Sequence, residues 1–385
     1  MTDFLDKNIC NELRNTVILS NIFHRDSKEK ENYNLICSVM DRVDSSIFYL
    51  NQHNQIPQTD DDFLLFMIYA CIINDATKEI LSKLNIKDES ICDKNYFKDI
   101  CMSSPLKLDE RSCPSDIKFF EYFRSLVFAH PFDTSRASFL KDNKETHYSP
   151  LLITNDNSMK KGCVGIMIYS NRTPKSMPMY IPFINLQDYI KKRYEMLSYA
   201  NNELKKRIER KNQEWKKQKI NRQQPPEKIL QDIGKVLKSR YLDTYEVDLL
   251  IKILEYESPN SKNIISVKKI QEVIIGSIQQ MCDNIESLNY EEYNSIVDGI
   301  IYAFPKHSYE TLIYDREKIF SYLSDSVDIK TDKLWGLHCA ENFSRHFAKK
   351  WVDINAKSMS YDEIKLLTIT ACYLELQAEK ETINE

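Results

Sequence analysis

Glycine is scarce in this chain of 385 residues, which contains only six, and none of them lies before residue 162. Phosphate-binding loops such as GxGxxG, or GxxxxGK followed by Ser or Thr, need several glycines at fixed offsets. The backbone has to turn tightly there and approach the phosphates closely. No segment of the sequence fits either pattern. The dinucleotide-binding and P-loop classes of enzyme are therefore excluded.

Paired cysteines and long apolar runs are also missing. The ten cysteines include no CxxC pair, and most lie among apolar neighbours, as buried thiols do. The first ten residues, MTDFLDKNIC, lack the basic and apolar segments of a signal peptide, and no run approaches the roughly 18 apolar residues that cross a bilayer. We therefore expect reduced cysteines, no membrane span and a cytoplasmic location.

Charge is distributed unevenly along the chain, although the net charge is only −4. Residues 1–140 have 16 Lys or Arg against 22 Asp or Glu, a net charge of −6. The remainder has 37 against 35, a net charge of +2. A polyanion would therefore bind more favourably to the second part of the chain.

The spacing of apolar residues predicts a mainly α fold. Helical intervals recur in the first part of the chain over residues 34–49, 61–84 and 117–129. Ser115 and Asp116 are suited to cap the last of these helices, and Pro131 to end it. These segments predict an N-terminal helical bundle.

The pattern changes between residues 147 and 184, where β-rich runs alternate with turn sequences. This predicts a small three-stranded antiparallel sheet. A long charged helix over 186–220 and a proline-containing loop follow it. Helical spacing then recurs over 227–257, 262–286, 290–303, 308–324, 331–352 and 359–380. We predict an N-terminal helical domain (1–140), a sheet with the long basic helix (141–224), and a C-terminal helical bundle (225–385).

An arginine and a histidine at the end of the 117–129 helix are the strongest candidates for chemistry. Arg124 is a cation among the apolar residues of FFEYFRSLVFAHP, where it needs a partner or a ligand. His130 follows six residues later, and Pro131 disfavours α geometry at His130, so the imidazole can turn toward the face of Arg124. Such a pair suits metal-independent cleavage of RNA, in which Arg holds the phosphate oxygens and His exchanges a proton.

At these residues the sequence resembles the HEPN superfamily, helical domains in which an Arg is followed after four to six residues by a His at the end of a late helix. The resemblance covers roughly residues 30–135 and rests on Arg124 and His130 in RSLVFAH, after two long helices. It implies a HEPN-like bundle that forms a homodimer, so that two Arg/His pairs line one RNA-cleaving cleft. It also implies a toxin, abortive-infection or other antiviral role in phage defence.

Three neighbouring residues are candidates for accessory roles. We expect Glu121 and Ser125 to orient the Arg/His pair, and Arg136 to add a contact to an RNA phosphate. With these residues, the sequence predicts a metal-independent endoribonuclease that has RNA as its partner.

Packing alone offers a different interpretation of the same residues. Arg124 would then pair with Glu121 or Asp116 inside the bundle. His130 would cap the helix, and Arg136 would be a surface charge. This interpretation predicts a non-catalytic helical scaffold.

Residues 205–219, KKRIERKNQEWKKQK, form a basic run with one tryptophan. Lys216 and Lys217 would attract a phosphate backbone, and Trp215 would stack on an unpaired base, which predicts a nucleic-acid-binding regulator. The alternative is a solvated helix face with Trp215 packed against a neighbouring helix.

The segment from Trp335 to His346 contains potential metal ligands. His338, Glu341 and Asn342 share one helix face, but no second set of ligands has convincing spacing, so we expect no metal and no cofactor. The nucleophile-elbow pattern GxSxG of hydrolases is absent. We expect the C-terminal helices to bind a protein regulator or to sense a trigger.

Overall fold

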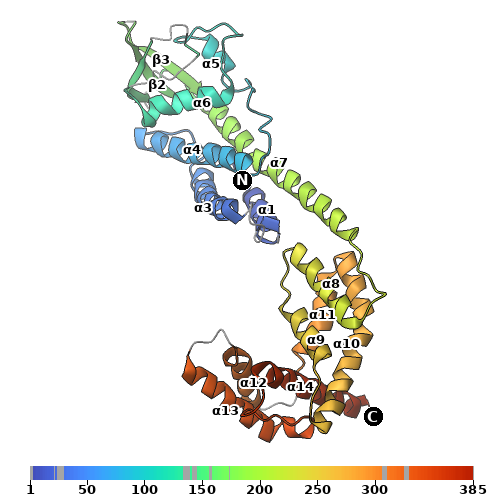
Figure 1. Cartoon of the computed structure of the whole chain (residues 1–385). Helices are drawn as coiled ribbons and strands as arrows, with labels where there is room; N and C mark the ends of the chain where they lie inside the picture. Colours follow the sequence, from blue (N-terminus) through green and yellow to red (C-terminus); the bar gives the residue numbers. More distant parts are fainter. Residues whose placement is uncertain are drawn as a thin grey trace. The chain divides into compact units, whose positions relative to one another are not determined.

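The computed structural model describes residues 3–20, 22–23, 30–132, 139–140, 145–155, 158–172, 174–305, 310–324 and 329–384. Over these residues the chain is mainly helical, with one three-stranded antiparallel sheet (Figure 1). The predicted fold class, mainly α with a small antiparallel β insert, is confirmed. None of the helices in these ranges is both long and apolar enough to cross a bilayer.

The chain divides into two compact units, residues 1–208 and 209–385. The helices of the first unit include α1 (Lys7–Ile18), α3 (Lys30–Gln52), α4 (Asp60–Lys83), α5 (Lys98–Met102), α6 (Asp116–Arg124) and the π-helical turn η1 (Ser125–Ala129). Helix α4 begins with a capping box, in which Thr59 and Asp62 each bind the other's backbone N–H. Helix α4 then packs against α3 and also contacts η1.

The sheet consists of β1 (His147–Ile153), β2 (Cys163–Ser170) and β3 (Met177–Pro182), paired in that order. Gly165 of β2 lies opposite Tyr180 of β3, and a Cβ at this position would fall 1.9 Å from the Met179 carbonyl oxygen. Only glycine therefore allows the two strands to approach this closely. Alternate side chains of β2, including Val164 and Ile166, are fully buried in the core that the helices form.

One hydrophobic core joins the N-terminal helices, the sheet and the first part of the long helix α7 (Phe183–Lys216). Leu186, Ile190 and Leu197 of α7 are fully buried in this core. The division between the units consequently falls after residue 208, inside α7. The three predicted domains, 1–140, 141–224 and 225–385, rest instead on the change from helical to β-strand spacing and on the proline-containing loop after the long helix.

The second unit is helical throughout its described part. Its elements are α8 (Pro226–Ser239), α9 (Tyr245–Glu255), α10 (Ser261–Ser287), α11 (Tyr290–Ile301), α12 (Glu310–Tyr322), α13 (Lys330–His346), the 3-10 turn η2 (Ala348–Lys350) and α14 (Tyr361–Asn384). The predicted helical segment 227–257 is two helices, because Tyr241 adopts a left-handed backbone with φ 60° and ends the first of them.

A fully buried arginine, Arg240, holds the ends of two helices in the second unit. Its Nη1 donates to the Ile285 carbonyl at 2.6 Å and to the Tyr290 hydroxyl at 3.2 Å. Its Nη2 donates to the Trp215 carbonyl at 2.8 Å, and its Nε to Gln218 at 3.2 Å. The Ile285 and Trp215 carbonyls lie in the last turns of α10 and α7, where the helix dipole favours a cation.

Replacing Arg240 with leucine is expected to lower the free energy of unfolding of the second unit by about 2 kcal/mol. Two buried carbonyl groups would lose their donors, and an unpaired buried carbonyl group lowers stability by about 1–3 kcal/mol. Removing the buried charge of Arg240 stabilises the fold and offsets part of this loss. Urea denaturation followed by circular dichroism measures the change. Lys235→Leu, at a side chain that is 75% exposed, is the control and should change stability by less than about 0.5 kcal/mol.

Candidate active site

Helix α6 starts from a buried carboxylate. Asp116 is 2% exposed and accepts hydrogen bonds from the backbone N–H groups of Asn95, Tyr96 and Phe97 at 2.7, 3.1 and 3.1 Å. Ser115 occupies the N-cap position, but its side chain makes no capping hydrogen bond. The carboxylate of Asp116, and not the predicted Ser115 cap, therefore ties the start of α6 to the preceding loop.

The aromatic face of α6 fixes the rotation of the helix. Phe119, Phe120 and Phe123 are fully buried. Their rings pack against those of Phe97, Tyr189 and Phe63, with centroids 4.8, 4.9 and 6.2 Å apart, respectively. Because these three phenylalanines occupy the core, Arg124 lies at the edge of the helix that faces α4.

The helical segment ends at Ala129, so His130 leaves the helix as the position of Pro131 predicted. The His130 N–H donates to the Ser125 carbonyl at 2.8 Å, which closes a π-helical turn, and His130 itself has φ −145° and ψ 61°. This backbone is outside the α region, and the residue is exposed. Pro131 accounts for the change because its ring disfavours α geometry at the preceding residue. Within the described part of the chain, the His130 ring has no hydrogen-bond partner.

Arg124 is partly exposed and bound to a carboxylate on a different helix. Its Nη1 donates to Asp75 Oδ2 of α4 at 3.0 Å, with side-chain exposures of 31% for Arg124 and 49% for Asp75. Burial disfavours the charged guanidinium, but Asp75 and Cys71 hold the pKa of Arg124 above its ordinary value. Burial raises the pKa of the Cys71 thiol to about 12, so this thiol is not a nucleophile at neutral pH. The ion pair that packing alone predicted, with Glu121 or Asp116, is replaced by the pair with Asp75.

The predicted accessory residues are engaged elsewhere. Glu121 Oε1 accepts from Lys78 Nζ at 3.2 Å, and the Ser125 hydroxyl donates to the Glu121 carbonyl at 2.9 Å. In the described residues, neither side chain hydrogen-bonds to Arg124 or His130. Arg136, the predicted phosphate contact, lies outside the described residues.

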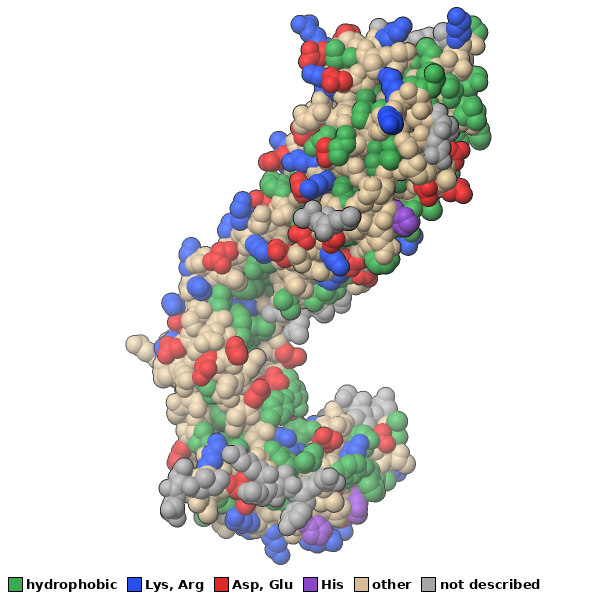
Figure 2. Space-filling view, turned by 180° about the vertical axis from the view of Figure 1, so that it is seen from behind, with side chains coloured by type: hydrophobic (Ala, Val, Ile, Leu, Met, Phe, Trp, Pro, Cys, Tyr) green, Lys and Arg blue, Asp and Glu red, His purple; other side chains and the backbone are tan. Residues whose placement is uncertain are grey.

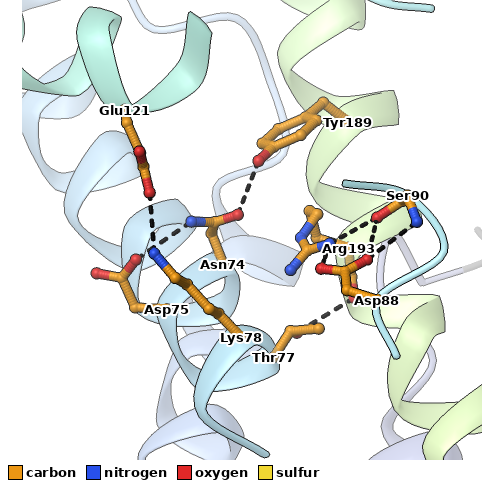
Figure 3. A network of polar contacts seen from close by, with 9 residues as sticks. All are labelled: Asn74, Asp75, Thr77, Lys78, Asp88, Ser90, Glu121, Tyr189 and Arg193. Atoms are coloured by element: carbon orange, nitrogen blue, oxygen red, sulfur yellow. Dashed lines mark hydrogen bonds and ion pairs between the residues drawn. The ribbon is translucent and has the colours of Figure 1, made fainter. Parts of the chain in front are cut away.

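A chain of hydrogen bonds connects Arg124 to the long helix α7, and most of it is drawn in Figure 3. Tyr189 of α7 donates to Asn74 Oδ1 at 2.7 Å, and Asn74 Nδ2 donates to Asp75 Oδ1 at 3.2 Å. The other oxygen of Asp75 holds Arg124. Sequence analysis missed Asn74 and Asp75, although two polar residues directly after the apolar run FLLFMIYACII were a usable signal.

A second buried pair joins α7 to the loop after α4. Arg193 of α7 is 1% exposed, and its Nη1 donates to Asp88 Oδ2 at 2.8 Å and to the Ser90 hydroxyl at 2.7 Å (Figure 3). The Thr77 hydroxyl of α4 donates to the Arg193 carbonyl at 3.2 Å. Burial opposes ionisation of Asp88, but hydrogen bonds from Ser90 and the charge of Arg193 hold its pKa below the ordinary value. These contacts fix α7 against α4 next to Asn74 and Asp75.

A buried relay at the sheet was also missed. The Tyr122 hydroxyl lies 2.6 Å from His147 Nδ1, and His147 Nε2 lies 3.1 Å from Glu145 Oε1, which accepts from the Ser170 hydroxyl at 2.6 Å. Burial raises the pKa of Tyr122, so its hydroxyl keeps its proton at neutral pH. The adjoining cavity, which Glu145, His147 and Ser170 help to line, has a volume of about 70 Å³ and is too small for a nucleotide.

The basic run on α7 does not provide a stacking platform. Trp215 is 7% exposed, so its ring is not available to a base. Lys216 and Lys217 are exposed. Some lysines of the run form ion pairs with its glutamates, for example Lys211 with Glu214 at 3.3 Å.

The described residues contain no group of side chains arranged to hold a metal ion. His338, one of the candidate ligands, has its Nε2 3.2 Å from Asn342 Nδ2, which is a contact along one helix. No family model, no curated protein and no solved structure matches this chain, so its function has to be argued from its own residues.

Proposed function

We propose that the chain is a metal-independent endoribonuclease of the HEPN type, with Arg124 and His130 as its catalytic residues. The observation that carries the proposal is the end of α6. A partly exposed guanidinium lies there, and six residues later an exposed imidazole has left the helix. Neither group is buried in the core, so both can be reached by a substrate.

The chemistry needs only these two groups and RNA. The 2′-hydroxyl attacks the adjacent phosphorus, its proton passes to a base, and the 5′-oxygen leaves with a proton from an acid. The products are a 2′,3′-cyclic phosphate and a 5′-hydroxyl. His130 would make one of these proton transfers, and Arg124 would bind the non-bridging oxygens, where negative charge develops.

Asp75 gives Arg124 a defined orientation for this role. A guanidinium has five N–H donors in a planar fork, and the bond to Asp75 uses one of them. A phosphate would approach from the side away from the Asp75 carboxylate, because the two anions repel each other. The second proton transfer would fall to His130 of another copy of the chain, which is how a homodimer would complete the site.

A non-catalytic helical scaffold is the second candidate. The ion pair between Arg124 and Asp75 favours it, because this pair also satisfies a partly buried cation without any ligand. A regulator that binds nucleic acid through residues 205–219 is a weaker candidate, because Trp215 is buried.

The test is cleavage of a labelled single-stranded RNA by the purified chain in EDTA. The proposal expects products that end in a 2′,3′-cyclic phosphate, and no cleavage when a single 2′-deoxy substitution removes the nucleophile at the cleaved linkage. Cleavage of the all-DNA strand, or activity only with added metal, would overturn the mechanism. If no RNA is cleaved, the scaffold candidate is favoured. Growth arrest on overexpression, lost in the cleavage-deficient variant, tests the toxin and phage-defence role.

A further inference from the structure

Half-exposed aromatic side chains gather on helices α12 and α13 of the second unit. Tyr314 is 44% exposed and Trp335 is 45% exposed, and Ile313 and Leu334 next to them are 44% and 56% exposed. The opposite face of α13 is buried through Gly336, Cys339, Ala340 and Phe343. A group of large apolar side chains that stays exposed to solvent commonly marks a binding surface.

Contacts between these side chains hold the rings in place. Trp335 Nε1 donates to the Tyr314 hydroxyl at 3.1 Å, and the Trp335 and His338 ring centroids lie 5.2 Å apart. Lys318 Nζ lies 5.2 Å from the centroid of Tyr314 and 4.8 Å from that of Tyr322. We define Tyr314, Lys318, Tyr322, Trp335 and His338 as the aromatic surface. Because these rings are already held in place, the protein would lose little side-chain entropy when a ligand binds.

Gly336 lets the two helices approach closely enough to form this surface. A Cβ at position 336 would lie 2.8 Å from Leu323 Cδ2 and 3.1 Å from Tyr322 Cβ. Glycine at this position therefore brings α13 against the end of α12 and places Trp335 next to Tyr314.

Cations are interleaved with the rings and continue beyond them. One face of α13 carries, at helical spacing, Trp335, His338, Glu341, Asn342, Arg345 and His346, and the exposed Lys349 comes after them. Among the side chains placed on α12, Asp315 is half-buried and interacts with His338 and His346, and Glu317 is exposed. Figure 2 shows charged side chains of both signs, Lys and Arg among them, between hydrophobic side chains on this unit. Lysine is depleted in protein–protein interfaces, whereas rings interleaved with cations suit a polyanion that has flat bases.

We propose that the aromatic surface binds single-stranded RNA, with a base stacked on Trp335 and the backbone phosphates near Lys318 and Arg345. The bases of a duplex are already stacked on one another, so only a single strand offers them to the rings. From Trp335 to Arg345 the helix rises about 15 Å, the length of two to three nucleotides. The inference rests on the proposed function for its choice of RNA, and names a part of the chain that would hold the substrate.

Binding and cleavage are separated by using the full chain with His130→Ala, which keeps the RNA intact. A 5′-fluorescein-labelled oligouridine is titrated with this protein, and the dissociation constant is obtained from anisotropy. Adding Trp335→Leu should weaken binding about tenfold, the size of one lost stacking contact. Lys318→Gln should weaken it less and reduce the slope of log K against log salt concentration by about one.

The matched control is Tyr169→Leu, which removes a ring of similar exposure, 43%, from strand β2 of the first unit. It should leave the dissociation constant unchanged. Each variant is checked by circular dichroism and melting. The His130→Ala chain also gives a second measurement that needs no further substitution. Trp335 is more exposed than Trp215, which is buried, and Trp351, so stacking should quench the tryptophan fluorescence as the RNA is added.

The inference is overturned if the oligouridine does not bind, if Trp335→Leu binds as tightly as its parent, or if a duplex competes equally well. It is also overturned if Trp335→Leu loses self-association and not RNA binding, since the surface would then be an interface between copies of the chain. If binding depends on Trp335 but the wild-type chain cleaves no RNA, the surface stands and the proposed nuclease activity falls.

Discussion

His130→Ala is expected to lower the rate of RNA cleavage by about 10²- to 10⁴-fold, the usual contribution of a general acid or base. The melting temperature should change little, because the ring is exposed and has no hydrogen-bond partner among the described residues. The rate is measured with a labelled RNA under single-turnover conditions, which report the chemical step.

Two further variants make this result specific. His53→Ala removes another exposed imidazole, directly after the end of α3, and should cleave RNA at the wild-type rate. Arg124→Lys keeps the positive charge but loses the planar fork, so it should also slow cleavage strongly. If His130→Ala and His53→Ala cleave at the same rate, His130 is not catalytic and the end of α6 is only a helix terminus.

Asp88→Asn is expected to lower the free energy of unfolding of the first unit by about 3–5 kcal/mol, the usual cost of leaving a buried charge without its partner. Arg193 is 1% exposed, and its Nε and Nη2 have no partner in the described structure. Asp88 is the carboxylate that compensates this charge. Urea denaturation at neutral pH, followed by circular dichroism, measures the loss.

The pH dependence of this effect has a definite sign. The pKa of Asp88 is lowered in the folded chain from an ordinary value of 3.8, so its contribution is complete well above pH 4 and is lost as the pH falls through the folded pKa. Wild type and Asp88→Asn should therefore approach each other in stability below about pH 4. A difference between them that stays constant well below pH 4 would contradict the ion-pair explanation.

A matched pair at the surface provides the control. Arg14 and Asp41 form the same kind of pair at 3.3 Å, but Asp41 is 79% exposed. Asp41→Asn should therefore cost less than about 1 kcal/mol. The double variant Asp88→Asn with Arg193→Met removes both members of the buried pair and should recover part of the loss. If it is less stable than Asp88→Asn alone, Arg193 acts mainly through packing.

Local sequence was sufficient to predict the candidate site's own helix. The apolar spacing in FFEYFRSLVF predicts a helix, and Pro131 predicts that His130 leaves it, because both effects act within one or two turns. The same local reasoning named Glu121 and Asp116 as partners of Arg124. The partner is Asp75, which lies 49 residues earlier in the chain.

This difference has a physical reason. Periodicity shows which face of a helix is apolar, but it does not show which second helix will pack against that face or at what rotation. Asp75 meets Arg124 because the phenylalanines of α6 are rotated into the core beside α4. The link from Tyr189 to Asn74 depends in the same way on where α7 packs.

By itself the sequence determined the mainly helical class, the place of the sheet, the absence of glycine-rich phosphate loops, and the release of His130 from its helix. These features depend on residues that are close together in the chain. Only the tertiary structure decided that Asp75 holds Arg124, that Trp215 is buried, and that the sheet and the start of α7 belong to the first unit. Each of these depends on long-range packing, in which a buried surface is shared between segments that local spacing does not connect.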